Sequence, residues 1–180
     1  MPLSARRLGT RDPVSAPSLP PLPPPHTRLG VGGILLRRDR VLVNRAVYRT
    51  RFTLPSGYVE PGEGFESALV REFEEETGVL VSVGPLVLAR HKVINATESD
   101  LYLGFLVEYR SGTPEARPPE IAEMREPTIP EALQAPWISE LSRLAIRLAA
   151  ERTARGWPRS KWPGGEVPGL VSETFHPAID

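Results

Sequence analysis

Gly57-Tyr-Val-Glu-Pro-Gly-Glu-Gly-Phe-Glu-Ser-Ala-Leu-Val-Arg-Glu-Phe-Glu-Glu-Glu-Thr-Gly-Val79 is the stretch of the sequence that indicates both a fold and a chemistry. Its second half, Phe65–Thr77, has no proline and is rich in strong helix formers. Gly78 stands where a helix commonly ends in the left-handed conformation, and Gly64 can serve as the N-cap. The stretch therefore predicts a glycine-rich loop followed by a helix.

Acidic residues gather on one face of this predicted helix. At about 100° per residue, Glu72, Glu75 and Glu76 fall within one arc, whereas Glu74 points elsewhere, into water. A neighbouring arc is apolar and can pack on a sheet; its residues are Leu69, Val70 and Phe73. The predicted helix thus presents three carboxylates beside its core-facing side.

Three carboxylates on one arc repel one another, and a divalent cation is the natural group to offset that repulsion. Hard cations such as Mg²⁺ and Mn²⁺ take oxygen ligands, and Mg²⁺ usually binds through a few carboxylates plus substrate phosphates. A loop rich in glycine, Ser56 to Gly64, precedes the helix and lets the backbone approach the same place. The alternative for the acidic run alone is a solvated helix face.

The flanking sequence predicts a mixed sheet. Apolar or β-branched runs favour strands at 29–36, 41–43, 79–83, 86–93 and 101–109, with a turn over 95–100 and a second helix over 139–154. Strands on both sides of a helix, followed by a closing helix, indicate an α/β class in which helices cover both faces of a mixed sheet.

Proline content divides the 180-residue chain. We expect a proline-rich, disordered tail over 1–25, a domain over 26–154, and a C-terminal tail over 155–180. Because that tail contains Trp157, Trp162 and Phe175, we expect part of it to pack on the domain or on the second subunit of a homodimer. The N-terminal prolines also oppose the amphipathic helix of a mitochondrial transit peptide. The apolar segment of a secretory signal peptide is missing, which argues against export, so we expect a cytoplasmic protein.

Composition excludes several classes of protein. Lys+Arg and Asp+Glu are 22 each, which argues against a general nucleic-acid binder. There is no Cys, so disulfides, thiol catalysis and Cys-ligated metal sites are absent. No apolar stretch is long enough to span a bilayer, so we expect no membrane partner.

The spacing of the decisive stretch is specific. It runs Gly57, five residues, Glu63, seven residues, Arg71-Glu72-Phe73, one residue, Glu75-Glu76, one residue, Gly78-Val79. This resembles the Nudix box of the Nudix hydrolases (MutT-like), with every motif position filled. The resemblance implies an α/β/α sandwich and Mg²⁺- or Mn²⁺-dependent hydrolysis of a small molecule, a nucleoside diphosphate linked to another moiety.

Site residues follow from the resemblance. Glu72, Glu75 and Glu76 look like metal-binding and water-activating carboxylates, with Arg71 orienting one of them. Glu63 looks like the outer acidic position of the loop. The backbone carbonyl of the residue before the first motif glycine often binds the metal, and here that residue is Ser56, where the family commonly has Gly.

A further acidic residue of this family often serves as base or extra ligand. Glu120 is preferred for that role, and Glu123, Glu98 and Asp100 are the rivals, with surface charge as the alternative for all four.

The substrate is less clearly indicated. The signatures of the ADP-ribose, NADH and coenzyme A enzymes of the family are missing. Tyr48, Phe52 and Tyr58 flank the motif and could stack on a base, with packing or surface positions as the alternative. His91 and Lys92 could contact phosphate. A second function also stays open: a binding or regulatory module of the same fold that recognises a nucleotide without cleaving it.

Overall fold

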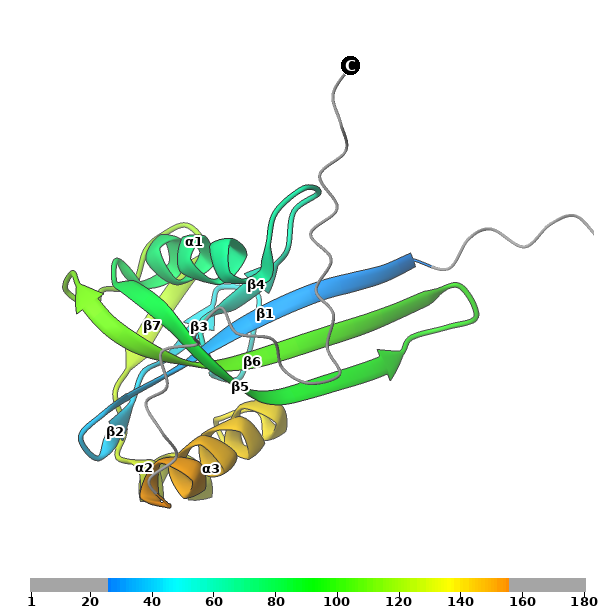
Figure 1. Cartoon of the computed structure of the whole chain (residues 1–180). Coiled ribbons are helices and arrows are strands. Elements are labelled where there is room, and N and C mark those ends of the chain that lie inside the picture. Colours follow the sequence, from blue (N-terminus) through cyan, green and yellow to red (C-terminus); the bar gives the residue numbers. More distant parts are fainter. Residues whose placement is uncertain (1–25, 156–180) are drawn as a thin grey trace, which may run out of the picture.

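The computed structural model describes residues 26–155 (Figure 1). The predicted tails at 1–25 and, from residue 156, at the C-terminus lie outside the described residues, and so do Trp157, Trp162 and Phe175. The strands are β1 (His26–Arg37), β2 (Arg40–Val41), β3 (Val43–Ala46), β4 (Ser56–Tyr58), β5 (Leu80–Val93), β6 (Glu98–Ser111) and β7 (Ile121–Arg125). The helices are α1 (Phe65–Thr77), α2 (Ile129–Gln134) and α3 (Glu140–Ala154).

The main sheet is mixed. Its order is β2-β1-β6-β5, and β4 also pairs with β1. The long strands β1 and β6 run parallel, whereas β1–β2, β1–β4 and β5–β6 are antiparallel. A second, two-stranded antiparallel sheet joins β3 to β7. The predicted mixed sheet is therefore confirmed.

Helices cover both faces of the sheet, as Figure 1 shows with α1 on one side and α2 and α3 on the other. Phe73 of α1 packs in one apolar core with Leu35, and Ile34 packs in the other core with Ile146 of α3. Consecutive residues of β1 thus point to opposite faces, as the pleat of a strand requires. This arrangement confirms the predicted α/β/α sandwich.

The predicted break between two strands at residues 84 and 85 is wrong. The expected strands at 79–83 and 86–93 form a single strand, β5, whose register with β6 shifts between Val83 and Leu86. Gly84 and Pro85 occupy that shift, and a bulge is where a strand tolerates a proline, because the missing N–H is not needed there. The strand therefore continues through the proline.

Two other boundaries also differ from the predictions. The expected strand at 41–43 is divided: β2 ends at Val41, and Val43 begins β3, which pairs in the small sheet. The predicted turn over 95–100 is shorter, because β6 already begins at Glu98. In the part of the chain that the structure describes, no helix is long and apolar enough to cross a membrane.

Candidate active site

Helix α1 holds the candidate site. Gly64 precedes it with an extended backbone, and Gly78 ends it in the left-handed region at φ 70°, with its N–H donating to the carbonyl of Glu74. Both predicted helix ends are confirmed. Phe73 packs against the sheet at Gly33, where any larger residue would overlap its ring. Because one side of the helix is buried in this way, its acidic side faces the loop that precedes it.

Glu76 is the most buried of the acidic residues, with 7% of its surface exposed. Its Oε2 accepts hydrogen bonds from the Asn44 side chain and from the backbone N–H of Ser56, both at 2.8 Å. Burial raises the pKa of Glu76 to about 7; the two hydrogen bonds oppose this shift, and the charges of Glu72 and Glu120 add to it. The carboxylate thus has hydrogen-bond donors but no cationic partner among these contacts.

Glu72 lies beside the loop, with 16% of its side chain exposed. A Cβ at Gly57 would overlap the Glu72 carboxylate, so the first glycine of the motif provides the space that this side chain fills. Arg71 Nη1 donates to Glu72 Oε1 at 2.9 Å. Burial raises the pKa of Glu72, Arg71 lowers it, and the charges of Glu75 and Glu120 raise it.

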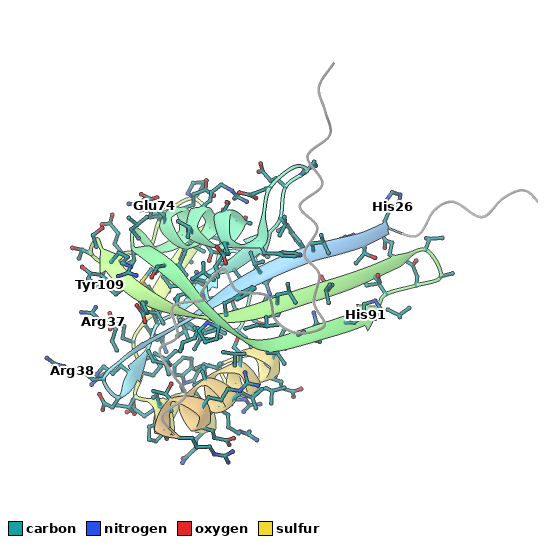
Figure 2. All side chains as sticks on the ribbon, in the orientation of Figure 1. His26, Arg37, Arg38, Glu74, His91 and Tyr109 are labelled. Carbon is teal, nitrogen blue, oxygen red and sulfur yellow. The ribbon has the colours of Figure 1, made fainter. Side chains whose placement is uncertain are left out.

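Glu75 is at the rim of the site. Its side chain is 59% exposed and its Oε2 lies 3.2 Å from Arg71 Nη1. Glu74 is exposed on the outer side of α1, as predicted and as Figure 2 shows. The three glutamates of the predicted arc therefore differ in depth: Glu72 and Glu76 are inside, and Glu75 is at the edge.

Arg71 joins the loop to the helix. Its Nε and Nη2 donate to the two carboxylate oxygens of Glu63 at 2.9 and 2.8 Å, and Nη2 also donates to the Tyr58 carbonyl at 3.2 Å. The hydrogen bond from Arg71 holds the pKa of Glu63 below its ordinary value. Since the same guanidinium binds Glu72, Arg71 fixes the distance between the loop and that carboxylate.

The donor set suits a hard divalent cation. The buried carboxylate of Glu76 and the partly buried carboxylate of Glu72 lie against the backbone at Ser56 and Gly57, and burial, with like charges, raises both pKa values. Within residues 26–155, no three His, Asp or Glu side chains already converge as a complete cluster. Mg²⁺ does not require one, because it commonly keeps waters and takes one or two carboxylates plus substrate phosphates.

Of the four candidate acidic residues outside the motif, Glu120 is the one among the largest influences on the pKa values of these carboxylates. The charge of Glu120 raises the pKa of both Glu72 and Glu76. Glu123 is instead ion-paired with Arg125 and Arg45, at 2.6 and 3.2 Å.

The two rivals at the start of β6 have ionic partners of their own. Glu98 lies 3.4 Å from Arg28, and Asp100 lies 2.8 Å from Arg90. The geometry thus favours Glu120, which is exposed and whose carbonyl is held by the N–H of Val47 at 2.9 Å.

The predicted aromatic residues separate into two kinds. Tyr48 is 71% exposed and Tyr58 is 53% exposed, so both rings are accessible to a ligand. Phe52 is 3% exposed: its ring meets Trp137 edge-on at 5.1 Å, and the Arg125 guanidinium lies 4.6 Å from its centre. The prediction that Phe52 stacks on a base is wrong, because its ring belongs to the core.

The two residues predicted to contact phosphate lie on the outer part of β5. His91 and Lys92 are exposed, and Figure 2 shows His91 near the far end of the long strands. The largest contributions to the pKa shifts of Glu72 and Glu76 come from burial and from other residues.

Asn44 is a site residue that the sequence analysis missed. It is 1% exposed on β3, and its side chain is bonded to Glu76 and lies 3.4 Å from the Thr53 hydroxyl. A single Asn on a strand of four residues carries no local signal. Its role follows only from the tertiary contact between β3 and α1.

Comparison with known proteins agrees with this geometry. A family model described as the NUDIX domain matches residues 26–149, which is more than half of the chain. The chain therefore belongs to the Nudix family, a class whose named relatives support hydrolysis of acid anhydrides.

Two curated relatives carry specific names. An ADP-ribose pyrophosphatase of Methanocaldococcus jannaschii is 37% identical over 65 residues, covering 34% of this chain and 38% of the relative. The NAD-capped RNA hydrolase NudC of Stutzerimonas stutzeri is 31% identical over 137 residues, covering 73% of this chain and 47% of the relative. The chain thus spans less than half the length of both.

Solved structures share the fold. The E. coli ORF135 protein superposes with a TM-score of 0.63 at 23% identity, covering 73% of this chain and 94% of that one. A MutT NUDIX hydrolase from Burkholderia pseudomallei gives 0.60 at 23% identity, covering 68% and 98%. These similarities establish the fold alone.

Proposed function

We propose that the chain is a divalent-cation-dependent hydrolase that cleaves the phosphoanhydride bond of a small molecule, a nucleoside diphosphate linked to another moiety. The observation that carries this proposal is the pair Glu72 and Glu76. Both are largely buried, both have raised pKa values, and both adjoin the backbone of the preceding loop.

Glu72 and Glu76 would hold the cation, assisted by the carbonyl of Ser56 and, from the rim, by Glu75. Bound there, Mg²⁺ or Mn²⁺ would neutralise the diphosphate and lower the pKa of a coordinated water. Asn44 and the Ser56 N–H fix the orientation of Glu76 by their two hydrogen bonds. Arg71 fixes Glu72 in the same way.

Glu120 and Glu75 are the candidates for accepting the proton of the attacking water. Both are exposed, and the charges of both act on Glu72. A carboxylate in that position removes a proton from the water as its oxygen attacks phosphorus. The bond to the bridging oxygen then breaks, and two phosphorylated products leave. No covalent intermediate with the protein is required.

The relatives guide the choice of substrates for a test. The purified chain is incubated with Mg²⁺ or Mn²⁺ and ADP-ribose, NAD or UDP-glucose in ¹⁸O-labelled water, with AMP as the monoester control. We expect at least one anhydride to be cleaved, with a single label in one phosphorylated product and AMP untouched. Cleavage of AMP alone would mean that the motif serves another reaction. Binding of an anhydride without cleavage would support a non-catalytic nucleotide-binding module instead.

A further inference from the structure

A row of side chains crosses the main sheet on the face opposite α1, because Gly30 has the same parity along β1 as Ile34, which packs against α3. Tyr58 of β4 pairs with Gly30 of β1, Gly30 pairs with Tyr102 of β6, and Tyr102 pairs with Arg90 of β5. Residues paired in this way point to the same face of a sheet. The row therefore presents two tyrosines on either side of a glycine, with a guanidinium at one end.

The ring of Tyr102 packs against glycines of β1 and β6. A Cβ at Gly32 would overlap the Tyr102 hydroxyl. A Cβ at Gly30 would be 3.4 Å from Cδ2, and one at Gly104 would be 3.6 Å from Cε1. A side chain at Gly32 would displace the ring, whereas the distances at Gly30 and Gly104 are ordinary van der Waals contacts. The absence of a side chain at Gly32 lets this aromatic ring lie close to the sheet.

This row borders the candidate active site. The same Cβ position at Gly32 lies 3.2 Å from Cβ of Ser56, the residue whose N–H binds Glu76. Burial raises the pKa of the Tyr102 phenol, the charge of Glu76 raises it further, and Arg90 and Arg49 oppose that shift. A substrate whose phosphates lie at Glu72 and Glu76 would reach the row past Ser56, at the edge of the sheet where β4 pairs with β1.

One N–H group of Arg90 has no acceptor among the described residues. Its Nη2 donates to Asp100 at 2.8 Å, but its Nε is buried and has no hydrogen-bond partner among the described residues. A buried N–H without an acceptor costs free energy, and proteins seldom leave one unpaired. A ligand acceptor next to Tyr102 would satisfy it.

We propose that Tyr102, Tyr58 and Arg90 form the subsite for the nucleobase of the substrate. The tyrosine rings contact the face of the base, and Arg90 Nε–H donates to an oxygen or ring nitrogen on its edge. A base fits this row because it is planar, stacks on aromatic rings and carries acceptors on its edge. The inference rests on the proposed function, since it assumes that the phosphates lie at Glu72 and Glu76.

The test measures binding without turnover. AMP, GMP, CMP and UMP, which the proposed function leaves uncleaved, are titrated calorimetrically into the full chain with Mg²⁺ present, and ribose 5-phosphate is the probe that lacks a base. The variants are Tyr102→Leu, Tyr102→Phe and Arg90→Gln. The matched controls are Tyr109→Leu and Arg110→Gln on the other end of β6; Figure 2 shows Tyr109 at the opposite end of the sheet from His91.

We expect at least one nucleotide to bind more tightly than ribose 5-phosphate. Tyr102→Leu should weaken that nucleotide by about tenfold or more and leave ribose 5-phosphate unchanged, because base stacking on an aromatic ring contributes at that level. Tyr102→Phe, which keeps the ring, should stay within about threefold, and Arg90→Gln should alter the preference among the four bases. The two controls should bind as the unaltered chain does.

Either of two results would overturn the inference: no preference for any nucleotide over ribose 5-phosphate, or equal weakening of both by Tyr102→Leu in a protein that melts normally. The proposed function fails separately. Base-dependent binding without hydrolysis of any anhydride would contradict the proposed function but support the subsite. Hydrolysis with an unchanged KM in Tyr102→Leu would support the function but contradict the subsite.

Discussion

Asn44 Nδ2 lies 2.8 Å from Oε2 of Glu76, and this hydrogen bond links a strand of the small sheet to the helix that carries the acidic residues. Both side chains are buried. The backbone N–H of Ser56 reaches the same oxygen, so both donors hold one side of the carboxylate. Asn44 thereby positions Glu76 without being one of the predicted ligands.

Replacing Asn44 should weaken the site more than the fold. We expect Asn44→Ala to lower kcat/KM by about 10- to 100-fold and to raise the Mg²⁺ concentration needed for half-maximal activity, as is usual for partners that orient metal ligands. A Mg²⁺ titration of activity measures both. Asn95→Ala, which removes a hydrogen-bonded Asn from the turn before β6, is the control and should titrate like the unaltered chain. Identical titrations for both variants would show that Asn44 has no such role.

A methyl group at Gly57 should displace Glu72. Because a Cβ there overlaps the carboxylate, we expect Gly57→Ala to reduce activity by about 100-fold or more. Gly64→Ala is the matched control: nothing lies within 4 Å of its Cβ position, and its φ of −82° suits any residue. That control should keep its activity and change the free energy of unfolding by about 1 kcal/mol at most. Full activity in Gly57→Ala would contradict the described packing.

The stability of the metal-free protein should depend on Glu76 and pH. The folded-state pKa of Glu76, about 7, lies above its ordinary 4.5, so the folded protein binds this proton more tightly than the unfolded chain does. The stabilisation is present at low pH and is lost as the pH rises from about 4.5 to about 7. The difference amounts to about 3 kcal/mol at most.

Glu76→Gln, which cannot ionise, should remove that dependence. In chelator, the unaltered chain should lose stability between pH 5 and pH 8 relative to Glu76→Gln. The free energy of unfolding of the variant minus that of the unaltered chain should therefore increase over this range. Urea unfolding at four pH values measures it. The exposed neighbour Glu74→Gln should show no such trend. Parallel profiles for Glu76→Gln and the unaltered chain would refute the raised pKa.

Lys should not replace Arg71. A guanidinium spans Glu63 and Glu72 with separate N–H groups, whereas an ammonium is a single point of charge. We expect Arg71→Lys to lower kcat/KM by about 10- to 100-fold while the protein stays folded. Arg147→Lys on the exposed side of α3 is the control. Equal kinetics of the two variants would mean that charge alone suffices at position 71.

Local patterns were sufficient to predict α1 and the long strands of the main sheet. Helix α1 has strong helix formers, an apolar face and a terminal glycine, and each of these is visible within a few residues. Strands β4 and β7 were not predicted, because three and five residues are too few to show a period. Helix α2 was not predicted either, although the capping box from Thr128 to Glu131 is a local signal for its start.

The site was predictable only where its residues are close in sequence. Glu72, Glu76, Arg71 and Glu63 lie in one motif, so their spacing carried the information. Asn44 and Tyr102 reach the site through strand pairing and helix packing, and nothing in their immediate sequence indicates it. The sequence beside the motif likewise did not reveal whether the Phe52 ring faces the core or the solvent.

The central claim is that Glu72 and Glu76 hold a divalent cation on which hydrolysis depends, and Mn²⁺ binding tests it most directly. Electron paramagnetic resonance counts free Mn²⁺ during titration of the unaltered chain, the double variant Glu72→Gln/Glu76→Gln, and the control Glu74→Gln. We expect the unaltered chain and the control to bind Mn²⁺ and hydrolyse an anhydride, and the double variant to remain folded with binding reduced by about 100-fold or more. Unchanged Mn²⁺ affinity in a folded double variant, or full hydrolysis in excess chelator, would contradict the account.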